Sequence, residues 1–228
     1  MPKDAKWYWS KRVDLTNSYG YGLNRRTRMV LETIDRLLPQ KTNLDVVDFG
    51  CADGAMLRGI KLHLGHRFRS GLGVDSFADG IPTNDPANAI RYVRHGFDRH
   101  EPLPVEHSSA DILVASAFLK HIKNPVRCLD EMSTVLRPGG IGVVLDPCSW
   151  VVRVGLRVGR FLGGIHSVWS RSTVESWLRE GNINLQVLEY QKYWVAPNYY
   201  VYRTGIERIL PRFIEQTIAL HQCLVLIK

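Results

Sequence analysis

The sequence lacks the features that mark secreted, metal-binding or membrane-spanning proteins. Only four of its 228 residues are cysteines, and no two have C-x-x-C spacing: Cys51, Cys128, Cys148 and Cys223. Their spacing removes the usual signals of a zinc site or a thioredoxin-like redox motif, and scattered thiols fit a reducing compartment. No uninterrupted apolar run approaches the ~18 residues of a membrane span, and the N-terminus has no apolar leader. We therefore expect a cytoplasmic protein without a metal site.

Acidic residues are scarce relative to basic ones. The chain has 22 Asp and Glu against 30 Lys and Arg, which gives a net charge of +8. A basic chain of this size favours nucleic acid, an anionic membrane surface or an anionic small molecule as partner. Because 45% of the residues are hydrophobic, intrinsic disorder is excluded as the main state.

Short apolar segments alternate with helical segments along most of the chain. Helices are predicted at 26–38, 55–64, 125–136 and 172–180. Strands are predicted at 44–49, 70–75, 90–94, 111–115, 141–145, 185–195 and 222–228. This alternation predicts a doubly wound α/β fold with a parallel sheet covered on both faces. Ser172 and Glu175 match a capping box for the last helix.

The segment with the most chemical information is the turn that follows the strand at 44–49. Gly50 and Gly54 permit close backbone approach to a ligand, and the helix after them offers free N–H groups. The segment is a poor dinucleotide fingerprint, because alanine stands where two of its three glycines belong. Asp48 and Asp53 would be unfavourable beside a pyrophosphate, but they suit an ammonium group. The turn therefore favours a ligand with a zwitterionic amino-acid moiety.

A second acidic residue ends the next predicted strand. Asp75 follows Gly54 by 21 residues, where an acidic side chain can accept hydrogen bonds from both ribose hydroxyls. An ammonium group at one carboxylate and a ribose at another describe S-adenosylmethionine.

An ordered set of motifs across residues 44–147 carries a family resemblance. The matching segments are Asp48-Phe-Gly-Cys-Ala-Asp-Gly54, Gly73-Val-Asp75, Pro102-Leu-Pro104, Ser109-Ala-Asp-Ile-Leu-Val-Ala-Ser116, His121, Leu129-Asp-Glu131 and Val135-Leu-Arg-Pro-Gly-Gly140. In these the sequence resembles the class I (Rossmann-like) SAM-dependent methyltransferases, within them the branch that acts on small molecules. The resemblance implies a mostly parallel seven-stranded sheet with an antiparallel last strand. It also implies an N-terminal helical cap (1–43), a SAM-binding core (44–147) and a C-terminal half with acceptor-pocket elements (148–228).

The resemblance also assigns cofactor contacts. Asp48 and the turn hold the methionine part, Asp75 binds the ribose, and Asp98 lies near the adenine amino group, although a purely structural role for Asp98 is equally open. The full set of expected cofactor-binding residues is Asp48, Gly50, Cys51, Ala52, Gly54, Asp75, Ser76, Phe97, Asp98, Ser116 and Ala117. Ala52 stands where many relatives have glycine, and we expect cofactor binding to survive the added methyl group.

The expected reaction is an in-line displacement of the methyl group from the sulfonium. Alignment of the nucleophile with the methyl group contributes ~7–11 kcal/mol in well-oriented systems. A hydroxyl acceptor also needs a base, and histidine is the usual one near neutral pH. His121 is the first candidate and His166 a weaker second, with loop packing as the alternative role.

The acceptor is predicted to be a small, apolar or aromatic molecule. The Asn/Asp-Pro-Pro-aromatic motif of base-amino methyltransferases is absent after the strand at 111–115, and Pro147-Cys148 follows the wrong strand for a cytosine-C5 nucleophile. Two alternatives remain. One is an RNA methyltransferase, although no strong nucleic-acid signal is present. It is prompted by the net charge of +8 and by two basic clusters, Arg25-Arg26-Arg28 and Arg58/Lys61/Arg67/Arg69. The other is a non-catalytic SAM-binding or adaptor protein.

Residues 150–163 form an Arg-rich amphipathic segment that fits a lid, a peripheral membrane contact or plain packing. The oligomeric state is left open.

Overall fold

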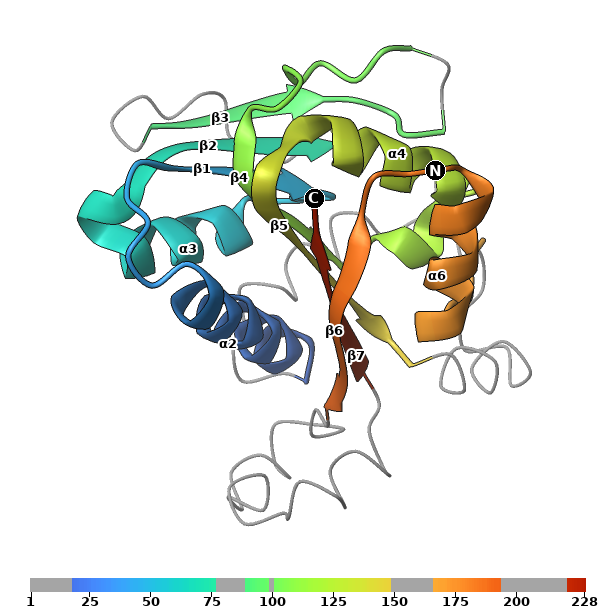
Figure 1. Ribbon diagram of the computed structural model, residues 1–228. Helices are drawn as coiled ribbons and strands as arrows, with labels where there is room; N and C mark the ends of the chain where they lie inside the picture. Colours follow the sequence, from blue (N-terminus) through green and yellow to red (C-terminus); the bar gives the residue numbers. More distant parts are fainter. Residues whose placement is uncertain (1–17, 77–88, 99–100, 149–165, 194–220) are drawn as a thin grey trace.

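The computed structural model describes residues 18–76, 89–98, 101–148, 166–193 and 221–228 (Figure 1). Its centre is a seven-stranded sheet with the order β3-β2-β1-β4-β5-β7-β6. The first five strands pair in parallel, while β7 is antiparallel to both of its neighbours, β5 and β6. The predicted fold, a mostly parallel sheet with an antiparallel last strand, is confirmed.

The elements follow the alternation predicted from the sequence. The strands are β1 (Leu44–Phe49), β2 (Phe68–Asp75), β3 (Ile90–Arg94), β4 (Ala110–Ser116), β5 (Leu136–Pro147), β6 (Gln186–Tyr193) and β7 (His221–Ile227). The helices are α2 (Ser18–Leu37), α3 (Ala55–Leu64), α4 (Pro125–Val135) and α6 (Arg171–Glu180), with short 3₁₀ turns at Gly65–Arg67 and Leu119–His121.

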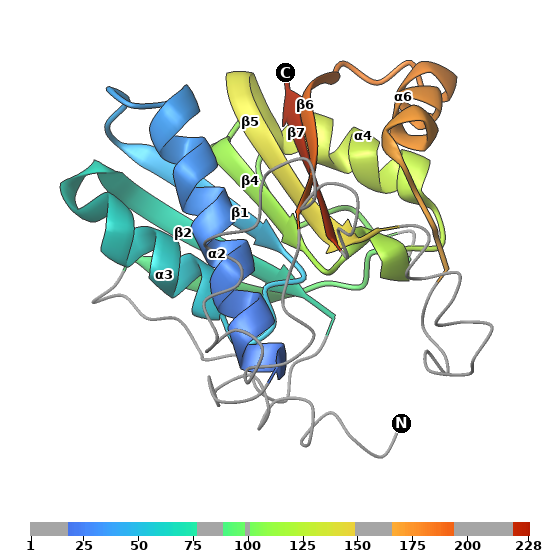
Figure 2. The same cartoon turned by 90° about the horizontal axis from the view of Figure 1, so that it is seen from below.

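Helices cover both faces of the sheet, with α2 and α3 on one face and α4 and α6 on the other (Figures 1 and 2). The strands alternate accordingly: on β5, Val143 and Leu145 pack in the cluster of α2 and α3, whereas Val144 packs in the cluster of α4 and α6. β1 and β4 are buried along almost their whole length, which explains why apolar residues occupy consecutive positions in both strands, as at Val46-Val47 and Ile112-Leu113-Val114, rather than alternate ones.

Two local predictions were wrong. The stretch from Pro138 to Gly140 does not separate α4 from a strand but lies inside β5, because β5 already pairs with β4 at Leu136. A register shift between Ala110 and Ile112 absorbs the extra residues, with Gly139 in the left-handed region at φ +74°. The N-cap of α6 is Ser170, not Ser172, because its extended backbone lets the side chain accept from the Thr173 N–H at 3.4 Å.

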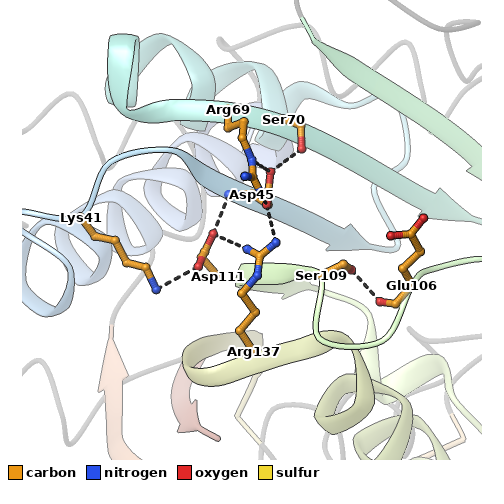
Figure 3. Close-up of polar contacts among 8 residues, drawn as sticks. All are labelled: Lys41, Asp45, Arg69, Ser70, Glu106, Ser109, Asp111 and Arg137. Carbon is orange, nitrogen blue, oxygen red and sulfur yellow. Dashed lines mark hydrogen bonds and ion pairs between the residues drawn. The ribbon is translucent and has the colours of Figure 1, made fainter.

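Charged residues from four neighbouring strands gather at the amino edge of the sheet (Figure 3). Asp45, Arg69, Asp111 and Arg137 are each the second residue of β1, β2, β4 and β5. Arg137 donates to Asp111 Oδ2 at 2.6 Å and to Asp45 Oδ2 at 2.7 Å, and Arg69 Nε donates to Asp45 Oδ1 at 2.7 Å. This ion-pair network ties together four strands whose sequences are far apart.

The network makes part of the stability dependent on pH. Burial by itself would raise the pKa of Asp45, but hydrogen bonds from Arg69, Ser70 and Arg137 outweigh it and lower the pKa from 3.8 to about 2. A carboxyl whose pKa is depressed in the folded state contributes stability that is present above its unfolded pKa near 4 and is lost as the pH falls toward 2. We expect Asp45→Asn to lose about 2 kcal/mol at pH 7, and this deficit should shrink between pH 4 and pH 2.

Urea denaturation across that pH range measures the effect. Asp35→Asn is the matched control, because Asp35 pairs with His63 and Arg67 but has a side chain that is 47% exposed. Exposed pairs contribute about 0–1 kcal/mol, so this control should lose little. Equal losses for both variants at every pH would contradict the assignment.

Candidate cofactor and acceptor site

The candidate site lies at the carboxyl edge of the sheet, opposite the ion-pair network. In open α/β sheets ligands bind outside the carboxyl ends of the strands where the strand order reverses. That point lies between β1 and β4, which are neighbours in the sheet although β2 and β3 separate them in the sequence. The turns after β1, β2 and β4 carry most of the predicted cofactor-binding residues.

The turn after β1 has an unusual backbone. Gly50, Ala52 and Gly54 lie in the left-handed region, with φ of +74°, +57° and +75°. The Gly50 N–H donates to Val74 O at 2.8 Å, and the Gly54 N–H donates to Cys51 O at 2.9 Å. Glycine occupies two of these positions because it adopts this conformation without steric cost. The turn is therefore a fixed loop that leads directly into α3.

Two buried carboxylates flank this loop. Asp48, in β1, is 1% exposed, and Asp75, at the end of β2, is 7% exposed. Asp75 Oδ2 accepts a hydrogen bond from the Ala52 N–H at 2.8 Å, which joins the turn after β1 to the end of β2. The structure thus brings together the two acidic residues that the sequence assigned to the methionine and ribose parts of the cofactor, and their roles stay predictions.

Aromatic side chains that the sequence analysis overlooked hold the loop on both sides. A Cβ placed on Gly50 would lie 2.5 Å from Phe118 Cδ2, and one on Gly54 would overlap the Tyr92 ring, 2.6 Å from Cε1. The Phe97 ring lies 4.9 Å from Phe49 and 4.6 Å from Phe118. Their spacing in the sequence gives no sign of this contact, because the rings come from β1, β3 and β4 and from the turns that follow them.

The remaining predicted cofactor-binding residues lie along the same edge. Cys51 and Phe97 are buried, whereas Ser76 and Asp98 are exposed. Asp98 Oδ1 accepts from the Lys123 N–H at 3.0 Å, so it joins the turns after β3 and β4. Ala117 has a φ of +56°, and its N–H donates to Leu145 O at 2.6 Å. Ser116 Oγ is buried and has no hydrogen-bond partner among the described residues.

The two candidate histidines are brought close by the backbone. His121 ends the 3₁₀ turn after β4, and the His166 N–H donates to Lys120 O at 2.8 Å. The side chains of both are exposed. A role as general base remains a prediction for each.

Lys120, the neighbour of His121, turns inward instead. Its Nζ donates to Ala117 O at 2.7 Å and to Asp146 Oδ1 at 3.2 Å, and its exposed fraction is only 8%. Asp146 Oδ2 also accepts from Trp169 Nε1 at 3.0 Å. Burial lowers the pKa of Lys120, and the charge of Asp146 opposes that shift. This buried pair fixes the turn after β4 to the end of β5.

The thiol after β5 has no sign of activation. Cys148 is buried, and burial raises its pKa to about 11. A nucleophilic cysteine needs a lowered pKa, because the thiolate is the reactive form. This agrees with the interpretation of Pro147-Cys148 as a chance match.

Several predicted features lie outside the described residues. They are the Arg-rich segment at 150–163, the first part of the predicted N-terminal cap (1–17) and residues 194–220 of the predicted C-terminal half. Within the described ranges, no helix is long and apolar enough to cross a membrane, and no three His, Cys, Asp or Glu side chains are grouped to hold a metal ion.

The residues at this edge fit S-adenosylmethionine. Buried carboxylates at the ends of adjacent strands, a left-handed loop between them and the unsatisfied Ser116 hydroxyl provide acceptors for an ammonium group and hydroxyls. A strand order of 3-2-1-4-5-7-6 with this loop after the first strand defines the class I methyltransferase fold.

A family model described as "Methyltransferase domain" matches residues 21–190, and the chain belongs to this family. S-adenosylmethionine is the methyl donor of the family, as predicted.

Relatives are distant. An uncharacterized methyltransferase of Mycolicibacterium vanbaalenii is 34% identical over 77 residues, which cover 34% of this chain and 29% of that protein. An S-adenosylmethionine-dependent methyltransferase from Mesorhizobium loti has a TM-score of 0.62 and 14% identity, covering 86% of this chain and 96% of the other. Phosphoethanolamine N-methyltransferase 2 from Haemonchus contortus, solved with S-adenosyl-L-methionine, has a TM-score of 0.58 and 15% identity, covering 88% and 52%. At these identities the solved structures support the fold alone.

Proposed function

We propose that this protein transfers a methyl group from S-adenosylmethionine to a small-molecule acceptor. The observation that carries the proposal is the pair of buried carboxylates, Asp48 and Asp75, on either side of the left-handed loop at the point where the strand order reverses. When bound, the cofactor supplies an electrophilic methyl group on a sulfonium.

In this proposal the protein binds and orients rather than reacts covalently. Asp48 accepts hydrogen bonds from the ammonium group. Asp75 accepts hydrogen bonds from the ribose hydroxyls with the carboxylate lone pairs that the Ala52 N–H does not use. Ser116 and Ala117 line the wall after β4, and Phe118 holds Gly50 in place. His121 is the proposed base for an acceptor hydroxyl, because it follows β4 on an exposed turn.

The arginines that prompted the RNA alternative are engaged within the fold. Arg26 is 6% exposed, and Arg28 pairs with Glu32 at 3.0 Å. Arg67 donates to Asp35, and Arg69 donates to Asp45. A phosphate backbone is bound by exposed Lys and Arg side chains. Burial removes Arg26 from that role, whereas the side chains of Arg28 and Arg69 are 70% and 53% exposed, so methyl transfer to RNA has to be tested directly.

Isothermal calorimetry with S-adenosylmethionine tests the proposal. The wild-type protein should bind the cofactor, and Asp75→Asn should weaken binding about 10- to 100-fold, because a charged acceptor of the ribose hydroxyls is lost while an oxygen remains for the Ala52 N–H. Asp130→Asn, an exposed acid on α4, is the control and should bind as the wild type does.

A flat titration of the wild-type protein would sink the cofactor assignment. Transfer of a labelled methyl group to RNA but not to a small-molecule extract, with steeply salt-dependent RNA binding, would instead favour the RNA alternative.

A further inference from the structure

A second group of polar side chains meets at the carboxyl edge, next to the proposed cofactor site. In the sheet register Pro147 of β5 is paired with His221 of β7, and His221 is paired with Tyr193 of β6. The buried pair of Lys120 and Asp146 lies one position away, since Asp146 is paired with Gln222. Arg26 of α2 lies near the same group, and its charge lowers the pKa of His221, Tyr193 and Lys120.

The Tyr193 Oη and His221 Nδ1 atoms are buried and have no hydrogen-bond partner in the described part of the chain. The two rings lie 5.6 Å apart. Tyr193 is 2% exposed, so water does not readily satisfy its hydroxyl. On the same strand Tyr190 follows the usual pattern, because its hydroxyl donates to Gln222 Oε1 at 2.9 Å. An unsatisfied buried hydroxyl costs stability, so two adjacent unsatisfied groups need an explanation.

The charge around these atoms is predominantly positive. Burial is the main reason that the pKa of His221 falls to about 3, and the charges of Arg26 and Lys120 lower it further. His221 is therefore neutral at neutral pH. The acidic group that faces the cluster is Asp146, whose two oxygens already accept from Lys120 and Trp169. Arg25 adds a further positive charge near Tyr193.

We propose that Tyr193, His221, Lys120 and Arg26 form a subsite for an oxyanion of the acceptor, a carboxylate or a phosphate group. The proposal rests on the methyltransferase function proposed above and narrows its substrate class to small organic acids or phosphate esters. The Tyr193 hydroxyl donates to the oxyanion, while Lys120 and Arg26 balance its charge. In the sheet order the subsite lies at the ends of β5, β7 and β6, on the side away from β1. An acid bound there would lie next to the cofactor and would not overlap it.

Binding of simple probes to the full-length protein tests the subsite. The probes are benzoate and phenyl phosphate, with benzamide as the uncharged analogue, each titrated in the presence of saturating S-adenosylhomocysteine. We expect at least one of the two anions to bind tenfold or more tightly than benzamide. The better of the two distinguishes a carboxylate from a phosphate site.

Tyr193→Phe is the decisive variant, because the proposal predicts that it stabilises the fold and at the same time weakens anion binding. Removal of an unsatisfied buried hydroxyl should raise the melting temperature by about 2–4 °C. The same change should weaken binding of the preferred anion about tenfold and leave S-adenosylmethionine binding unchanged. Tyr190→Phe removes a satisfied hydroxyl from the same strand; it should not raise the melting temperature and should leave the anion affinity unchanged.

The outcomes separate this inference from the proposed function. If S-adenosylmethionine binds but benzamide binds as well as both anions, the subsite is refuted and the proposed function stands. Unchanged anion affinity in Tyr193→Phe also refutes it. Failure of the wild-type protein to bind S-adenosylmethionine overturns both.

Discussion

Gly54→Ala should abolish tight cofactor binding and destabilise the fold at the same time. Gly54 has a φ of +75°, and a Cβ there would overlap the Tyr92 ring, 2.6 Å from its Cε1 atom. The left-handed conformation costs a non-glycine residue about 1–2 kcal/mol, and overpacking adds about 1–3 kcal/mol. We therefore expect a stability loss of about 2–5 kcal/mol by urea denaturation. A displacement of the loop should also weaken S-adenosylmethionine binding by more than about 100-fold in calorimetry.

The chain offers a matched control for the backbone part of this effect. Gly139, in β5, has a φ of +74°, close to that of Gly54, but no atom lies within 4 Å of a Cβ placed on it. Gly139→Ala should therefore lose only about 1–2 kcal/mol and keep full cofactor affinity. Equal behaviour of the two variants in cofactor binding would show that the loop after β1 does not hold the cofactor.

The buried pair of Lys120 and Asp146 supports the second large expected effect. Asp146→Ala removes the charge partner of Lys120 and the acceptor of the Lys120 and Trp169 N–H groups. Leaving one buried charge uncompensated costs about 3–5 kcal/mol. Burial already lowers the pKa of Lys120, and the shift becomes larger without Asp146. In Asp146→Ala the unfolded state then binds more protons than the folded state. The loss of stability in this variant should therefore shrink as the pH rises toward the unfolded lysine pKa near 10.

A double variant separates the charge effect from the hydrogen bonds. Lys120→Met with Asp146→Asn removes both charges but keeps an oxygen that accepts from Trp169 Nε1. Neutral replacements of buried pairs are often well tolerated, so we expect the double variant to regain more than half of the lost stability. Urea denaturation at pH 7 and at pH 9.5 measures the wild-type protein and both variants. A deficit in Asp146→Ala that does not change with pH would contradict the role given to the Lys120 charge.

The same pair is expected to affect turnover. Lys120 lies in the turn that carries Phe118 and His121, and Phe118 packs on Gly50 of the cofactor loop. Displacement of this turn in Asp146→Ala should therefore lower methyl transfer more than the loss of folded protein explains.

The candidate cofactor site could largely be located from the sequence, because its signals are local. A short β-prone run at 44–49 predicts a strand, and the glycines after it predict a turn with special backbone geometry. β3 was predicted with its observed bounds, Ile90–Arg94, and α3 likewise with Ala55–Leu64. The spacing from Gly54 to Asp75 predicted an acidic residue at the carboxyl edge of the strand next to the glycine turn. In the structure Asp75 lies there and accepts a hydrogen bond from the Ala52 N–H of that turn.

Errors arose where a distant strand competes with local preference. Pro138 and the two glycines after it indicate a break between helix and strand, yet pairing with β4 draws them into β5. The N-cap of α6 depends on which of two nearby serines has an extended backbone, and the sequence pattern does not distinguish them.

By itself the sequence determined the order of the elements and the residues of the loop, because these depend on local patterns. It also determined the family, because the family is visible in the order of local motifs across residues 44–147. Only the tertiary structure decided that Phe118 lies on Gly50, that Lys120 pairs with Asp146, and that Tyr193 and His221 stand side by side at the carboxyl edge. These contacts join residues far apart in the sequence, and the strand order of the sheet brings them together. For that reason the proposed cofactor site was visible in the sequence, while the proposed oxyanion subsite became visible only in the folded protein.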